Sequence, residues 1–153
     1  MAAGVTAPGP GSRRTRTWQA WALVAVELFV AYQAGYGGVG LITDTWDLPG
    51  EWLVRTPFPD WAGPGWVLIL LVGVPQVLAA IPVVAMPGRP RLGILAGLLA
   101  GISLLIWIGM QLAVLQVYFF LQPVIAVIGL VEIGLAYWWR HRLGTAAVAA
   151  SSR

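Results

Sequence analysis

Long apolar runs separated by short polar segments dominate this chain. One run extends from about residue 19 to 42, a second from 65 to 86, and a third from 92 to 139, with Glu132 as its only charged residue. A helix that spans a bilayer needs about 20 mainly apolar residues. The third run is therefore long enough for two spans. The turn between them is marked by Gln111, Gln116, Gln122 and Pro123, and proline suits the first turn of the helix that follows.

This pattern predicts an all-α polytopic membrane protein, a four-transmembrane-helix bundle. We expect the helices at about 19–42, 65–86, 92–114 and 121–139, within one membrane domain over residues 18–142. Residues 43–64 form an extracytoplasmic loop between the first two helices. Residues 1–17 and 143–153 are mostly small or polar, and we predict that both are disordered cytoplasmic tails.

Composition narrows the class of protein. The chain has 153 residues, of which 59% are hydrophobic and only 10% are charged, whereas a soluble domain carries about 25% charged residues. An ordinary soluble domain and a nucleic-acid-binding protein are therefore excluded. The absence of cysteine and the single histidine exclude a disulfide scaffold, a thiol nucleophile and a multi-histidine metal or haem site. We expect no cofactor.

The arginines predict the orientation of the spans. Eight of the nine lie before the first span, between the second and third, or after the fourth, and only Arg55 lies on the other side. Basic residues collect on the cytoplasmic side of membrane proteins. We therefore expect both termini in the cytoplasm.

The extracytoplasmic loop is longer than a simple helix–helix connection requires. One interpretation is a lid or docking surface whose carboxylates bind a cation. The other is an interfacial segment held by tryptophans, with solvated acids, and this is favoured because the acid spacing matches no calcium loop. Asp47 is expected to cap a short helix that begins near Pro49. The candidate contact residues are Asp44, Trp46, Asp47, Glu51, Trp52 and Asp60.

Each predicted span carries one polar residue at a similar depth. At 1.5 Å per residue, Glu27, Gln76, Ser103 and Glu132 lie about 10–16 Å from the cytoplasmic ends of their helices. An ionisable residue inside a span is costly and therefore marks a candidate functional site. The four residues form a predicted polar layer. No Lys, Arg or His within the spans can neutralise its acids.

Two roles for this layer stay open. Glu27 and Glu132 are either a proton-linked acid pair with Gln76 and Ser103 as hydrogen-bond partners, or a permanently protonated pair that joins the first span to the fourth. Beside the layer, Gly93, Gly97 and Gly101 recur every four residues in the third span. Such small residues allow close helix approach. Packing within one chain is favoured here over a homodimer.

Three segments carry a resemblance that covers residues 18–142. "AYQAGYGGVGLITD" (31–44), "TPFPDWAGPG" (56–65) and "LQPVIAVIGLVEIGLA" (121–136) resemble small four-span membrane proteins of high-GC actinobacteria, a group whose function is not established. The architecture is similar to that of DoxX-like proteins. The first helix, with one buried Glu, also resembles that of small multidrug-resistance transporters, but the long loop and the second acid depart from them. None of these resemblances implies a catalytic residue.

The sequence favours a non-enzymatic membrane protein that contacts the lipid bilayer. We expect an accessory subunit or a small lipophilic-ligand binder, whose partner is another membrane protein or a second copy of the chain. The alternative is a small proton-coupled transporter that uses Glu27 and Glu132. A membrane enzyme is less favoured, because the spans contain no Ser–His or metal-ligand constellation.

Overall fold

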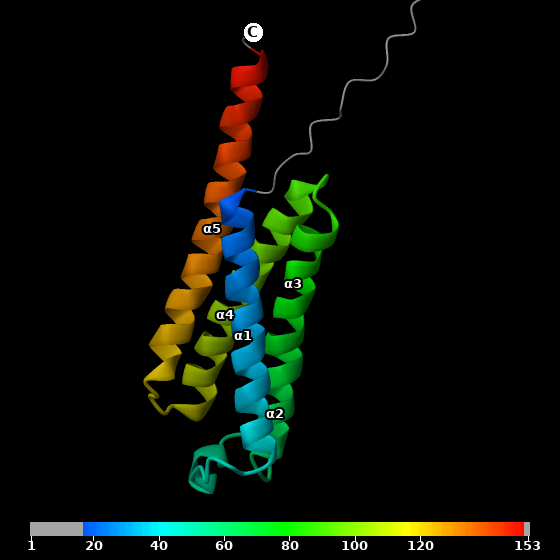
Figure 1. Cartoon of the computed structure of the whole chain (residues 1–153). Helices are drawn as coiled ribbons and strands as arrows, with labels where there is room; N and C mark the ends of the chain where they lie inside the picture. The colour runs from blue at the N-terminus through cyan, green and yellow to red at the C-terminus, as the bar shows by residue number, and fades with distance from the viewer. Residues whose placement is uncertain (1–16, 152–153) are drawn as a thin grey trace, which may run out of the picture.

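The chain folds as an all-α four-helix bundle, as predicted (Figure 1). The structure is a computed structural model that describes the backbone of residues 17–151 and the side chains up to Thr145. Its long helices are α1 (Trp18–Ile42), α4 (Pro90–Leu115) and α5 (Leu121–Ser151). The second span consists of α2 (Ala62–Leu68), the π-helical turn η2 (Ile69–Gly73) and α3 (Val74–Ala85). All four spans are long and apolar enough to cross a membrane.

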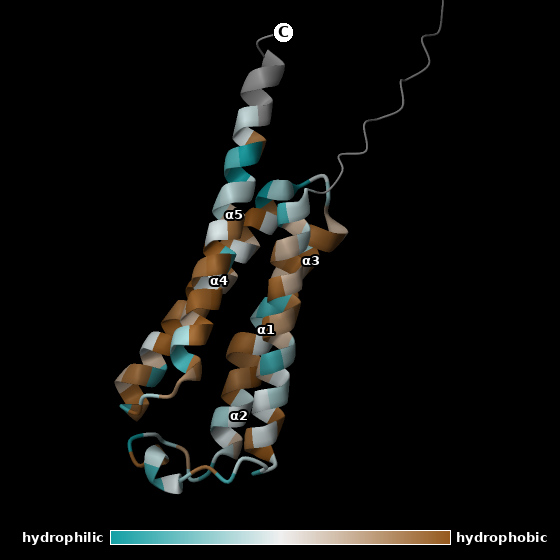
Figure 2. Cartoon of the chain, turned by 60° about the vertical axis from the view of Figure 1, so that its left-hand side comes forward, coloured by the Kyte–Doolittle hydropathy of each residue, from teal (hydrophilic) through white to brown (hydrophobic). Residues whose placement is uncertain are grey.

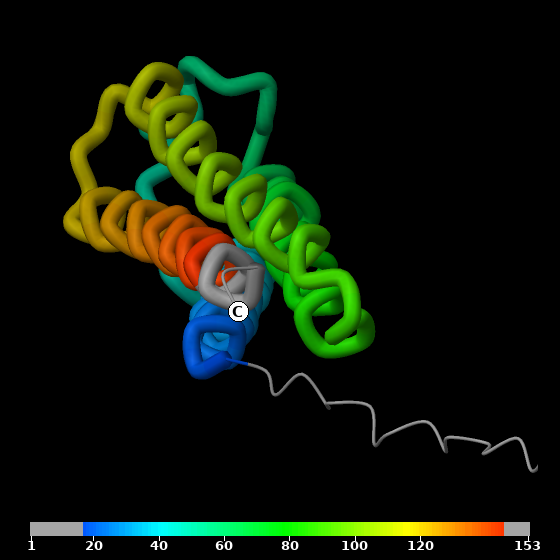
Figure 3. Tube along the Cα trace, turned by 90° about the horizontal axis from the view of Figure 1, so that it is seen from above, coloured from blue at the N-terminus to red at the C-terminus, as the bar shows by residue number. Residues whose placement is uncertain are grey.

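The spans form a ring, seen along its axis in Figure 3. The first span, α1, packs against the second span and α5, and α4 packs against α3 and α5. This places α1 opposite α4, and α3 opposite α5. The start of α1, the α3–α4 connection and the C-terminal part of α5 share one end of the bundle, here called the terminal end. The long loop and the α4–α5 turn share the opposite, or loop, end (Figure 1).

The outward faces of the spans are apolar. Large side chains on every span are more than half exposed, among them Phe29, Leu70, Ile106 and Leu130. Figure 2 shows apolar residues along all four spans. A soluble monomer rarely exposes apolar surface on this scale. The fold is therefore that of a multi-pass membrane protein whose outer surface contacts lipid.

The predicted glycine stripe on α4 packs inside the bundle. A Cβ atom at Gly101 would lie 2.6 Å from the carbonyl oxygen of Gly129 on α5. At Gly97 it would lie 2.6 Å from the Leu23 side chain of α1. At Gly93 it would contact side chains of α3 and α5. All three glycines therefore face neighbours in the same chain, as the favoured interpretation predicts.

The second span contains an irregularity that its prolines explain. Pro75 has no N–H, and its ring would clash with the carbonyl four residues earlier in a regular helix. The helix widens into the π turn η2, which ends at Gly73, just before this proline. A second proline, Pro82, lies inside α3. The span starts at Ala62 rather than at the predicted residue 65.

The fourth span corrects one prediction. Residues 143–151, predicted as part of a disordered tail, continue α5 as a helix that ends at Ser151. The alanines of this segment explain the difference, because alanine has the highest helix propensity. The predicted tail over residues 1–17 lies outside the described residues except for Thr17, and so do residues 152–153.

Candidate functional site: a buried polar cluster

Three of the four predicted polar-layer residues meet in the centre of the bundle. Glu27 from α1, Gln76 from α3 and Glu132 from α5 are each 0% exposed. We call these three residues the polar cluster. They come from three different spans, and each sits between apolar residues of its own helix.

Apolar residues close the polar cluster on both sides along the bundle axis. Toward the loop end lie Val30, Ala34, Val72 and Leu104. Toward the terminal end lies a larger group, Ala20, Leu23, Val24, Ala80, Val83, Ile94, Ala136 and Trp139. The cluster therefore lies in a low-dielectric environment, where an unpaired charge is far more costly than in water.

One hydrogen bond joins two members of the cluster across the ring. The Gln76 Nε2 group donates to Glu132 Oε2 over 3.1 Å, which links α3 to α5 although these helices lie on opposite sides. The Glu27 carboxyl interacts electrostatically with that of Glu132. The polar cluster is thus a single site with two acids and one amide.

Four oxygens of the cluster have no hydrogen-bond partner among the described residues. They are both carboxyl oxygens of Glu27, the Gln76 Oε1 atom and the Glu132 Oε1 atom. Buried polar atoms in native proteins are nearly always hydrogen-bonded, and each exception needs an explanation. A purely structural link between helices explains the Gln76–Glu132 hydrogen bond but leaves Glu27 without a role.

Ser103 does not join the cluster, which corrects the fourth member of the predicted layer. Its hydroxyl donates to the carbonyl oxygen of Ala100 in its own helix over 2.7 Å. Serine in a helix often bonds to a backbone carbonyl one turn earlier, and depth alone does not reveal this choice. The third span therefore contributes no polar group to the cluster.

Basic side chains are absent from the interior. In the described part of the chain, Arg89, Arg91, Arg140 and Arg142 are exposed at the terminal end, and Arg55 is exposed in the loop. None can neutralise the acids of the cluster from there. Each carboxyl group in this interior therefore needs either its own proton or a bound cation to avoid an unbalanced buried charge.

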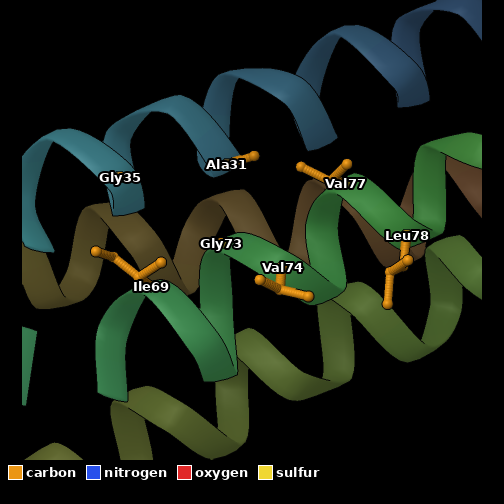
Figure 4. A pocket seen from close by; sticks show the side chains of 7 residues that line it. All are labelled: Ala31, Gly35, Ile69, Gly73, Val74, Val77 and Leu78. Carbon is orange, nitrogen blue, oxygen red and sulfur yellow. The ribbon is translucent and has the colours of Figure 1, made fainter. Parts of the chain in front are cut away.

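An apolar groove lies beside the cluster on the lipid-facing side (Figure 4). It has a volume of about 280 Å³ and runs between α1 and the second span. Ala31 lies one helical turn from Glu27, while Gly73 and Val77 lie on either side of Gln76 in sequence. The sequence alone does not predict this groove, although the small residues that line it are a signal. The lining residues are Ala31, Gly35, Ile69, Gly73, Val74, Val77 and Leu78.

The loop between α1 and α2 is held by its tryptophans. Trp61 Nε1 donates to the carbonyl oxygen of Leu48 over 3.0 Å, and its ring meets that of Trp52 edge-on. Trp46 packs edge-on against Tyr36 of α1, with 5.6 Å between ring centroids. Leu53 is 4% exposed. These contacts show that tryptophans hold the loop to the rest of the chain, while its position at the membrane interface stays a prediction.

The loop acids do not converge on one point. Asp60 Oδ1 accepts a hydrogen bond from the Ala62 amide at the start of α2. Asp44, Asp47 and Glu51 are exposed. Within the described ranges, no three His, Asp or Glu side chains come together as metal ligands would. The structure therefore gives no support to a cation site in this loop.

The short loop helix differs from the prediction in its cap. It is the 3₁₀ helix η1 (Gly50–Leu53), which follows Pro49 and has no side-chain cap. Asp47 adopts a left-handed conformation with φ 43°. Asp and Asn tolerate this region better than other non-glycine residues, so Asp47 turns the chain instead of capping the helix.

No known family can be assigned to the chain. No protein-family model matches it, and no curated protein or solved structure matches it significantly. The resemblances to actinobacterial, DoxX-like and multidrug-resistance proteins therefore remain predictions. The function has to be inferred from the polar cluster, the groove and the loop.

Proposed function

We propose that this chain is a small proton-coupled membrane transporter in which Glu27 carries the exchangeable proton and Glu132 is its neighbouring acid. The observation that supports this proposal is that Glu27 is fully buried and that neither of its carboxyl oxygens has a hydrogen-bond partner among the described residues. Glu132, by contrast, accepts a hydrogen bond from Gln76. The two acids therefore have different roles.

The energetic cost of Glu27 supports a functional role. An interhelical hydrogen bond in a membrane contributes only about 0.6 kcal/mol on average, and Glu27 does not make one within the described chain. An apolar side chain at this position would avoid the desolvation cost of a carboxyl. Ionisable residues within spans are usually part of proton or substrate pathways. We infer that proton exchange is what Glu27 provides.

The proposed membrane is a bacterial cytoplasmic membrane, with both termini in the cytoplasm. The distribution of arginines supports this orientation. In that arrangement the terminal end of the bundle faces the cytoplasm and the loop faces the opposite side. The polar cluster then exchanges protons between the two sides.

Infrared spectroscopy of the protein in lipid nanodiscs tests the proposal. We expect a band from buried carboxylic acids that changes with pH in the wild type and loses most of its pH response in Glu27→Gln. The matched control is Glu51→Gln, which removes an exposed loop acid and should leave that response intact. A buried-acid band that does not change with pH would refute proton exchange at the cluster.

A flux measurement tests transport itself. In proteoliposomes that contain a pH-sensitive dye, a pH gradient imposed in a buffer of Na⁺ and K⁺ salts should dissipate faster with the wild type and with Glu51→Gln than in empty liposomes. Glu27→Gln should reduce the rate to that of empty liposomes. Equal rates for the wild type and Glu27→Gln would contradict the assignment of the exchangeable proton to Glu27.

The groove favours a second candidate function, a small lipophilic-ligand binder. Its apolar lining and volume of about 280 Å³ are close to those of small-molecule pockets, which start at about 300 Å³. A Cβ atom at Gly35 would meet nothing within 4 Å, so Gly35→Leu can fill the groove without strain. Native mass spectrometry should detect a retained lipophilic molecule in the wild type but not in Gly35→Leu. Identical spectra would reject this candidate.

A further inference from the structure

The polar cluster presents more oxygen atoms than the protein uses. Glu27, Gln76 and Glu132 provide four oxygens without a described partner. One of them, Gln76 Oε1, is an amide oxygen, which either accepts a hydrogen bond from a protonated carboxyl or coordinates a cation. Because Gln76 is 0% exposed and its amide nitrogen bonds to Glu132, this free oxygen lies within the cluster. Two carboxyls and an amide oxygen are hard ligands of the type that alkali and alkaline-earth cations prefer.

The charge balance of the interior also favours a bound cation. Glu27 and Glu132 are the only buried ionisable side chains in the described spans. The basic side chains Arg89, Arg91 and Arg140 are exposed at the terminal end. A carboxylate in this interior therefore needs either its own proton or a bound cation. A monovalent cation that replaces one proton leaves the total charge of the interior unchanged.

The number of ligands selects the type of cation. Ca²⁺ takes 6–8 oxygen ligands, and Mg²⁺ requires near-ideal octahedral geometry and loses its waters reluctantly. The cluster offers four unpartnered oxygens and is closed by apolar residues on both sides. Such a site suits a single small cation of low charge that has lost its water shell. Among common ions, Na⁺ has these properties.

We propose that Glu27, Gln76 and Glu132 bind one dehydrated Na⁺ ion in exchange for one proton. This inference rests on the proposed proton exchange at Glu27 and names the substrate class of that exchange. When Na⁺ enters, the Glu27 carboxyl releases its proton to the solution and its oxygens become ligands. Gln76 supplies its amide oxygen as a ligand while its nitrogen holds Glu132 in place. One positive charge enters and one leaves, so no oxidant or other reactant is needed.

Proton release on addition of salt tests this proposal. Purified protein in weakly buffered detergent solution is mixed with NaCl, or with choline chloride at the same ionic strength, in the presence of a pH-sensitive dye. We expect Na⁺ to release about one proton per chain, because bound metal ions displace the protons of their ligands. Choline should release none. The infrared band of buried carboxylic acid should fall in parallel.

Gln76→Leu separates the cation site from the proton site. This variant removes the amide oxygen but keeps both acids, so it should lose the Na⁺-induced release while its carboxyl band still responds to pH. The matched control is Gln33→Leu, which replaces an exposed glutamine of α1 and should behave as the wild type. If Gln76→Leu does not fold, the comparison of Na⁺ with choline on the wild type still decides the proposal.

The outcomes distinguish failure of this inference from failure of the proposed function. If pH changes the carboxyl band but Na⁺ and choline have equal effects, the Na⁺ site is wrong and proton exchange stands. If neither pH nor Na⁺ changes the band, both proposals are wrong. If K⁺ releases protons as effectively as Na⁺, or if Gln76→Leu keeps its Na⁺ response, the assigned site is wrong.

Discussion

The contact between Gly101 and Gly129 should determine how closely α4 approaches α5. A Cβ atom at Gly101 would lie 2.6 Å from the Gly129 carbonyl oxygen and 2.8 Å from Ile133 Cγ1. The carbonyl oxygen is part of the backbone, so a change of rotamer cannot relieve the clash. In Gly101→Ala the two helices must therefore separate by several tenths of an ångström. The matched control is Gly109→Ala on the same helix, where a Cβ atom would meet nothing within 4 Å.

The expected effect follows from two opposing terms. Replacing glycine by alanine in a helix favours folding by up to about 1 kcal/mol, and this gain applies to both variants. Overpacking of a tight interior costs about 1–3 kcal/mol, and this cost applies only to Gly101→Ala. We therefore expect Gly101→Ala to be about 1–3 kcal/mol less stable than Gly109→Ala. The Glu132 Cβ atom lies 3.1 Å from the new methyl position, so the change should also weaken the Gln76–Glu132 hydrogen bond.

Unfolding in mixed micelles with a denaturing detergent measures this difference. A double-mutant cycle with Gly129→Ala strengthens the test, because a Cβ atom there would lie 3.0 Å from the Gly101 carbonyl oxygen. Two substitutions at one contact should be non-additive. Equal stabilities of Gly101→Ala and Gly109→Ala would refute the reasoning. A loss of dimer without a loss of stability would show instead that the stripe joins two copies of the chain.

Three further predictions concern single side chains. Glu27→Leu should keep or raise the free energy of unfolding, since it removes a carboxyl without a described partner. Glu132→Leu should lower the free energy of unfolding by about 1–3 kcal/mol, because it leaves the buried Gln76 amide unpaired. The same unfolding assay compares the two variants. Gln122→Leu should speed hydrogen exchange of the Phe119 amide, because this amide donates a hydrogen bond to Gln122 Oε1 over 3.1 Å. An unchanged exchange rate would show that this hydrogen bond does not protect the amide. Trp61→Phe should speed trypsin cleavage at the loop arginine, because it removes the hydrogen bond to the Leu48 carbonyl; unaltered cleavage would mean that this bond does not hold the loop.

The spans could be predicted from the sequence because the bilayer imposes a simple rule. Backbone groups in hydrocarbon must be paired within the segment, so an apolar run of sufficient length becomes a helix. The ends of the helices are harder to predict. Residues 143–151 have few large apolar side chains, which resembles a tail, yet their alanines extend α5 to Ser151. The π turn at Ile69–Gly73 was also not predicted, because a proline indicates an irregularity without specifying its form.

The depth of the candidate site in the membrane could be predicted from the sequence, but its hydrogen bonds could not. Counting residues along each helix placed Glu27, Gln76 and Glu132 at one level, and all three are fully buried there. The same counting included Ser103, whose hydroxyl bonds to its own helix. A depth estimate gives the height of a side chain in the membrane. It does not give the rotamer, and the rotamer decides which atoms are paired.

The incomplete pairing of the cluster argues for function more strongly than the presence of buried acids does. A fully paired network stabilises a fold, whereas a partly paired one is less stable than an apolar interior. Neither carboxyl oxygen of Glu27 has a partner among the described residues, and the Ser103 hydroxyl, at a similar predicted depth, is bonded to Ala100 instead. Proteins depart from such local rules mainly where function requires it. In the proposed function, the carboxyl oxygens of Glu27 therefore serve an exchanging proton or cation, while Gln76 and Glu132 fix the position at which it binds.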